Sequence, residues 1–155
     1  MLNIKLKGAI SLATHSDCIF CKIVKGDIPS AKVYEDELVY AFLDISQVTK
    51  GHTLVIPKTH AKDIYETEED IAANVFSRVP KIANAIKESF SPIGLNILNN
   101  NEAPAGQSVF HLHIHLIPRY NKEDGFGMKW VTHDDRYTRE DLSSIAEQIN
   151  QKISS

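Results

Sequence analysis

The stretch Phe110-His111-Leu112-His113-Ile114-His115-Leu116-Ile117-Pro118 alternates histidines with aliphatic residues. In a β-strand, successive side chains point to opposite faces, and residues two positions apart on one face lie about 6.6–7 Å apart. The pattern therefore predicts a strand over 110–118 whose aliphatic face packs into the core. Its opposite face would carry three imidazoles close enough together to act on one bound group.

Three interpretations fit this histidine face. Two imidazoles at positions i and i+2 of a strand can bind zinc. Alternatively, one neutral imidazole can act as a nucleophile near neutral pH while the others assist it. The third interpretation, polar residues on a solvated face, is the weakest, because strict alternation of three histidines by chance is uncommon. Spacing alone leaves the first two open.

The stretch resembles the signature of the histidine-triad (HIT) family, His-φ-His-φ-His-φ-φ, in which φ is an apolar residue. Further segments typical of bacterial members are Cys18–Ile23, Leu43–Ile45, Gly51–His60, Ala105–Phe110, Ile117–Tyr120, Gly125–Gly127 and Trp130. The resemblance covers residues 16–155. Residues 1–15 fall outside it, and we interpret them as a disordered or vector-derived extension before a single HIT domain.

The expected fold is α+β, with a mostly antiparallel sheet of about five strands. Strands are expected over 32–34, 38–45, 53–57, 95–98 and 110–118, with a further one over 128–132. A short helix is expected from Asp17 to Gly26. A long helix with an apolar stripe over 71–90 follows the capping-box-like residues 67–70, and Pro80 should kink or split it. A C-terminal helix is expected after a second such box over 138–141.

Composition limits the classes of function. The chain has 155 residues, 43% hydrophobic and 24% charged, with a net charge of −3. The lack of excess basic charge argues against a nucleic acid polymer as partner, although not against a small nucleotide. No apolar run approaches the ~20 residues of a membrane helix, and the N-terminus is at best a marginal export signal. We therefore expect a cytoplasmic protein with no membrane partner.

The resemblance implies nucleotide chemistry at the histidines. His113 is the expected nucleophile, which attacks the α-phosphorus of a purine nucleoside 5′-monophosphate derivative and forms a nucleotidyl-histidine that water releases as AMP or GMP. A backbone carbonyl near His115 is expected to accept a hydrogen bond from the other ring nitrogen of His113. His115 is expected to donate to the leaving atom, Ser108 to hold phosphate oxygens, and His52 to support the cluster from a neighbouring strand.

The nucleotide is expected to bind in a pocket built from several segments. The implied binding residues, besides His113, His115 and Ser108, are Asp44, Ile45, Phe20, Ile23, Phe42, Asn100, Gly106 and Gln107. Among these, Asp44 would accept the ribose hydroxyls and Gly106 would let the backbone approach the phosphate closely. The implied activity is that of a nucleoside phosphoramidase of the Hint-type branch. Alternatives are a dinucleoside polyphosphate hydrolase, a nucleotide-binding regulatory module with little catalysis, and a zinc-stabilised scaffold.

The cysteine pair points to a metal. In a reducing compartment, a C-x-x-C pair such as Cys18 and Cys21 binds metal or has a redox role more often than it forms a structural disulfide. The resemblance implies that His60 and His111 complete a structural zinc site with four protein ligands. His111 could then bind zinc while His113 reacts. The resemblance also implies a twofold homodimer, and the apolar stripe over 71–90 fits either its interface or an intramolecular core.

Overall fold

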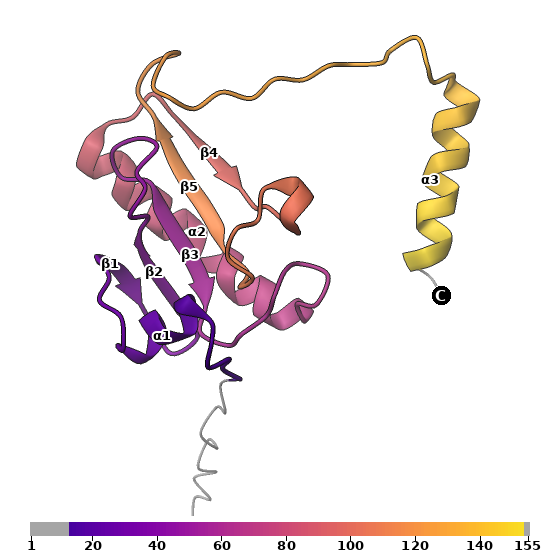
Figure 1. Ribbon diagram of the computed structural model, residues 1–155. Coiled ribbons are helices and arrows are strands. Elements are labelled where there is room, and N and C mark those ends of the chain that lie inside the picture. Colours follow the sequence, from indigo (N-terminus) through magenta and orange to yellow (C-terminus); the bar gives the residue numbers. More distant parts are fainter. Residues whose placement is uncertain (1–12, 154–155) are drawn as a thin grey trace, which may run out of the picture.

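The computed structural model describes residues 13–153, which contain a five-stranded antiparallel sheet and three α-helices (Figure 1). The sheet has the order β1-β2-β3-β5-β4. Its strands are β1 (Lys32–Glu35), β2 (Val39–Leu43), β3 (Thr53–Pro57), β4 (Gly94–Leu98) and β5 (Ile114–Arg119). The helices are α1 (Ile19–Lys25), α2 (Glu69–Phe90) and α3 (Arg139–Ile153), with a short 3-10 turn at Ala103–Ala105. The predicted α+β class is confirmed.

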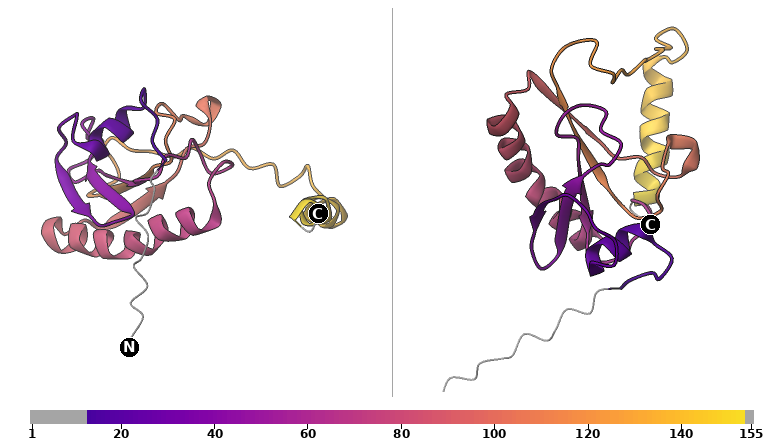
Figure 2. Two further views of the ribbon diagram at one scale, coloured as in Figure 1. Left: turned by 90° about the horizontal axis from the view of Figure 1, so that it is seen from below. Right: turned by 60° about the vertical axis from the view of Figure 1, so that its left-hand side comes forward.

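The core lies on both faces of the sheet, because a helix covers each face (Figure 2). On one face, α2 buries Val75, Val79, Ile82 and Ile86 against β2, β3 and β5. These residues recur at helical spacing, so one stripe of α2 meets the sheet. The apolar stripe of the long helix is therefore mainly intramolecular core.

On the other face, α1 brings Phe20, Cys21 and Ile23 against β2 and β3. The helix begins after Cys18, which has no side-chain capping bond, so the expected cap at Asp17 is wrong. It ends at Gly26, whose φ of 85° is a left-handed conformation that glycine adopts without steric cost. Helix α1 and its N-cap thus place both cysteines in the buried cluster on this face of the sheet.

Helix α2 differs from the expectation at two points. It runs unbroken from Glu69 to Phe90, so Pro80 does not split it. Pro80 and Phe76, the residue four positions before it, are both exposed, so the carbonyl that lacks an N–H partner is on the solvent side. At its start, Glu68 occupies the N-cap position without a side-chain bond, and Thr67 donates its hydroxyl to the Asp63 carbonyl instead.

The histidine stretch enters the sheet later than expected, because β5 begins at Ile114. Before that point the backbone bonds elsewhere: the His111 N–H donates to the Val109 carbonyl and the Leu112 N–H to the Ala61 carbonyl. Of the three histidines, His115 alone belongs to the strand. His111 and His113 lie in the segment that leads into it.

The C-terminal part of the described chain stands apart from the sheet. In Figure 1, a long segment leads from β5 to α3, which lies away from the other elements. The predicted strand over 128–132 is wrong, since this segment has no regular structure. The capping box of α3 is confirmed: the Asp141 N–H donates to the Thr138 hydroxyl, and the Thr138 N–H to the Asp141 carboxylate. No helix within 13–153 combines the length and hydropathy needed to cross a bilayer.

Candidate active site and metal centre

A cavity of about 780 Å³ opens on the α1 face of the sheet. Its volume lies in the range of sites that bind small molecules. The expected site residues that line it are Phe20, Ile23, Phe42, Asp44, Ile45, Ser108, His113 and His115. Its walls also include Ile19, Ile28, Leu54 and Val109, which sequence reasoning did not single out. Residues from segments far apart in the sequence therefore meet around one space.

His113 is held by its own chain. Its Nδ1 lies 2.6 Å from the carbonyl oxygen of His111. A carbonyl only accepts, so Nδ1 carries the hydrogen and Nε2 keeps its lone pair. The acceptor is thus His111, not a carbonyl near His115 as expected. Burial lowers the pKa of His113, which favours the neutral ring.

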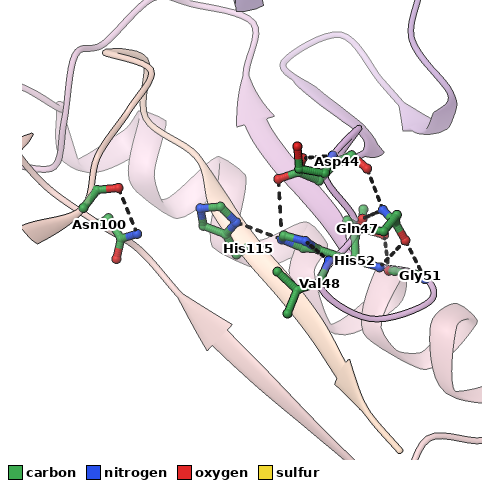
Figure 3. Close-up of polar contacts among 10 residues, drawn as sticks. Asp44, Gln47, Val48, Gly51, His52, Asn100 and His115 are labelled. Atoms are coloured by element: carbon green, nitrogen blue, oxygen red, sulfur yellow. Dashed lines mark hydrogen bonds and ion pairs between the residues drawn. The ribbon is translucent and has the colours of Figure 1, made fainter. Parts of the chain in front are cut away.

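His115 receives its orientation from His52, which precedes β3 (Figure 3). His52 Nε2 lies 2.9 Å from His115 Nδ1, and the Val48 N–H makes a long 3.5 Å bond to His52 Nδ1. This chain assigns hydrogens to His52 Nε2 and to His115 Nε2. Burial, with the neighbouring imidazoles His113 and His52, lowers the pKa of His115 to about 4. Burial also lowers the pKa of His52.

Asp44 directly follows β2 and begins the loop that leads to His52. One carboxylate oxygen accepts the Ser46 N–H at 2.8 Å, and the other lies 3.7 Å from His52 Nε2. The Gln47 amide closes this loop: it donates to the carbonyls of Asp44 and His52 and accepts the N–H groups of Gly51 and His52 (Figure 3). Sequence reasoning missed Gln47, because no local pattern distinguishes it from any loop glutamine.

The remaining expected residues shape a loop beside the cavity and do not line it. Gly106 has a φ of 91°, and its carbonyl accepts the Asn100 amide at 3.4 Å. The buried Gln107 amide accepts the Glu102 N–H and donates to the carbonyls of Lys62 and Val109. These contacts fix the backbone that presents Ser108 to the cavity.

Four possible metal ligands form a cluster next to His113. The ligand atoms of Cys18, Cys21, His60 and His111 are all within 4.8 Å of one another. The Cys18 Sγ–His111 Nδ1 and Cys21 Sγ–His60 Nδ1 distances are both 3.4 Å, and Cys21 Sγ lies 3.7 Å from His111 Nδ1. Tetrahedral zinc with ordinary Zn–S and Zn–N bonds separates sulfur from nitrogen by about 3.6 Å. The donor set therefore fits zinc.

The protonation of the cluster also suits a metal. His111 Nε2 lies 2.9 Å from the Pro57 carbonyl, which places its hydrogen there and leaves the Nδ1 lone pair for a metal. Burial lowers the pKa of His111 to about 4 and also lowers that of His60. Burial raises the pKa of the Cys21 thiol, a cost that a bound cation would offset. Neither cysteine is in a disulfide.

Two further contacts surround these groups. His15, for which the sequence indicated no role, stacks on His60 with ring centroids 5.3 Å apart, and its backbone N–H points to Cys21 Sγ at 3.4 Å. Asp44, His52 and His115 also bring ligand atoms within 4.8 Å of one another. In that group, however, the two imidazoles already hydrogen-bond to each other.

The chain is similar to known proteins in sequence and in fold. A HIT family member from Bacillus subtilis has a crystal structure that matches with a TM-score of 0.87 at 64% identity, covering 90% of this chain and 99% of that one. An adenosine 5′-monophosphoramidase from Schizosaccharomyces pombe is 43% identical over 136 residues, 88% of this chain and 98% of that protein.

A metal-bound relative is also known. The crystal structure of a Zn-bound histidine triad family protein from Mycobacterium smegmatis matches with a TM-score of 0.68 at 37% identity, covering 85% of this chain and 97% of that one. The HIT domain family model matches residues 25–122, which contain the histidine segment, Asp44 and Ser108. On these grounds, the chain belongs to the HIT domain family.

Proposed function

We propose that this protein hydrolyses, or transfers the nucleotidyl group of, purine nucleoside 5′-phosphoramidates through a nucleotidyl-His113 intermediate. The orientation of His113 carries the proposal. Its Nδ1 is committed to the His111 carbonyl, so the lone pair of Nε2 remains for attack, and the ring lines the cavity. A buried, neutral imidazole is a competent nucleophile near neutral pH.

The proposed reaction has two displacements. Nε2 of His113 attacks the α-phosphorus, and the P–N bond to the amine breaks with its electron pair leaving on nitrogen. The neutral His115 directs its Nε2 hydrogen at the departing nitrogen as a hydrogen-bond donor, and that nitrogen takes its proton from a water molecule, which becomes hydroxide. A second water molecule then attacks phosphorus, loses a proton that neutralises this hydroxide, and releases AMP or GMP with neutral His113. The 4.9 Å between the two ring centroids lets both act on one phosphate.

The cavity supports a nucleotide as substrate. Phe20, Ile23 and Phe42 offer an apolar wall for a base, and Asp44 can accept ribose hydroxyls. The Ser108 hydroxyl lies on the same cavity and can donate to phosphate oxygens. The name of the yeast relative, an adenosine 5′-monophosphoramidase, supports an adenosine nucleotide over other ligands.

We also propose that Cys18, Cys21, His60 and His111 hold a structural zinc ion. With four protein ligands no position is left for water, so the ion would cross-link α1 and the segments around His60 and His111 without taking part in the reaction. The Zn-bound mycobacterial relative supports this proposal. Zinc thiolates need reduced cysteines, which supports a cytoplasmic location.

Replacing His113 with alanine should lower AMP release from an adenosine phosphoramidate by at least about a thousandfold, because the attacking nitrogen is lost. His133→Ala, an exposed histidine far along the chain from the cavity, should retain wild-type activity. Rates with diadenosine polyphosphates, measured in parallel, show whether the preferred leaving group is an amine or a nucleotide. AMP release that persists in His113→Ala would refute the nucleophile, and AMP binding without turnover in the wild type would indicate a regulatory module.

The Asp44→Ala variant should bind AMP at least about tenfold more weakly, since a hydrogen bond to a charged group contributes about 1.5–3 kcal/mol. The same variant should bind 2′,3′-dideoxy-AMP about as well as the wild type does, because that ligand lacks the hydroxyls. Titration calorimetry measures both. Equal losses for the two ligands would reject the ribose role and indicate that Asp44 acts through its contact with His52.

The acid limb of kcat/KM should lie below pH 6.5. Burial lowers the pKa of His113 and takes that of His115 to about 4, so both rings stay neutral as the pH falls through the ordinary histidine range. Rates between pH 4.5 and 8, with circular dichroism at each pH and an enzyme-free blank, check this expectation. A half-maximal value at or above pH 6.5 would contradict it.

We propose that two copies form a homodimer. Strand β4 is an edge of the sheet, with Ile97 52% exposed, and α3 leaves Leu142, Ile145 and Ile149 uncovered. Light scattering on a size-exclusion column should give twice the mass of one chain, independent of concentration in the micromolar range. A single-chain mass would reject the dimer.

A further inference from the structure

We infer that His111 is a positioning residue that joins the metal cluster to the nucleophile, so that zinc occupancy sets the affinity of the cavity for nucleotide. The inference rests on the zinc site and the nucleotide site proposed above. What it adds is a coupling between them through one residue. The side chain of His111 belongs to the metal cluster, while its backbone carbonyl accepts the hydrogen bond of His113.

The first connection is this carbonyl. The His111 ring is completely buried and is held at both nitrogens, by Cys18 Sγ at 3.4 Å from Nδ1 and by the Pro57 carbonyl at 2.9 Å from Nε2. The carbonyl of the same residue lies 2.6 Å from His113 Nδ1. A ring fixed in this way limits how the backbone at 111 can turn. The direction of the carbonyl, and with it the tautomer of His113, therefore depends on the cluster.

The second connection is Phe20, which stands between the two cysteines in the sequence. Its ring makes edge-to-face contacts with His113, at a centroid distance of 5.3 Å, and with His111, at 5.8 Å, and Phe20 also lines the cavity. Helix α1 has only seven residues and no side-chain cap. A helix this short is marginal by itself, so ligation of Cys18 and Cys21 would fix the wall that Phe20 and Ile23 provide.

Loss of zinc would act through both connections. The four side chains would then hold one another only through sulfur–nitrogen contacts of 3.4–3.7 Å, which are weaker than metal–ligand bonds. Helix α1 and His111 would move more freely, and His113 would populate both tautomers. Thermodynamic linkage requires the reciprocal effect: if zinc strengthens nucleotide binding by some factor, the nucleotide strengthens zinc binding by the same factor.

The test compares AMP binding to the zinc-loaded and the zinc-free protein. Elemental analysis first establishes about one zinc per chain in protein purified without chelator. Calorimetry should then give AMP affinity at least about fivefold higher with zinc than without it. Competition against a chromophoric chelator should show the same factor in zinc affinity with and without saturating AMP. Nitrogen-15 NMR should find His113 protonated at Nδ1 alone with zinc and as a tautomer mixture without it.

Val24→Ala is the matched control, because Val24 packs on the α1 face of the core without lining the cavity or joining the cluster. This variant removes packing from α1 but leaves all four zinc ligands in place to hold the helix, so the zinc-loaded variant should keep its AMP affinity within twofold of wild type. If the zinc-free protein unfolds, its AMP affinity cannot be compared with that of the loaded protein. The rate of zinc transfer from the wild-type protein to the chelator is then measured instead, and AMP should slow that transfer.

Three kinds of failure are distinguishable. Equal AMP affinities in folded loaded and zinc-free protein, or zinc transfer that AMP does not change, overturn the coupling and leave both sites standing. Less than about 0.2 zinc per chain overturns the coupling together with the proposed metal site. No AMP binding to the loaded protein overturns it together with the proposed nucleotide site.

Discussion

The hydrogen bond from His113 Nδ1 to the His111 carbonyl is the contact on which the candidate site depends. It joins two residues two positions apart, in the segment just before the chain enters the strand. The backbone groups of 111 and 112 bond outside the sheet, and β5 starts only at Ile114. The late start of β5 thus separates the histidines into two environments. His111 faces the cysteines, whereas His113 and His115 line the cavity.

Much of this arrangement could be predicted from the sequence. Alternation over 110–118 indicated a strand with Ile114 and Leu116 in the core, and both are completely buried. Helical spacing in α2 indicated its buried stripe, and Gly26 marked the end of α1. The prediction that Cys18, Cys21, His60 and His111 lie together rested on family resemblance. Local sequence could not supply it, because Cys18 and His111 are 93 residues apart and only the fold brings them together.

Other features depend on contacts that local sequence does not encode. Alternating residues predict a strand but not the point at which its hydrogen bonds to the sheet begin. Here the Leu112 N–H donates to the Ala61 carbonyl and not to a neighbouring strand. The roles of Gln47 and His15 arise from loops whose ends are set by the sheet. Asn100, Gly106 and Gln107 are expected at the nucleotide, yet the Asn100 and Gln107 side chains and the Gly106 carbonyl make hydrogen bonds that hold the loop itself and tie it to Lys62.

In the described chain, no lysine or arginine lines the cavity, and the histidines beside Asp44 are held in their neutral form. A phosphate there would meet oriented N–H and O–H dipoles in place of a full positive charge. Binding of this kind is little affected by salt, because counterions screen net charges far more than fixed dipoles at contact distance. For the proposed reaction it also aids turnover. AMP carries more negative charge than the phosphoramidate from which it is formed, and it would leave a cavity whose one formal charge is a carboxylate.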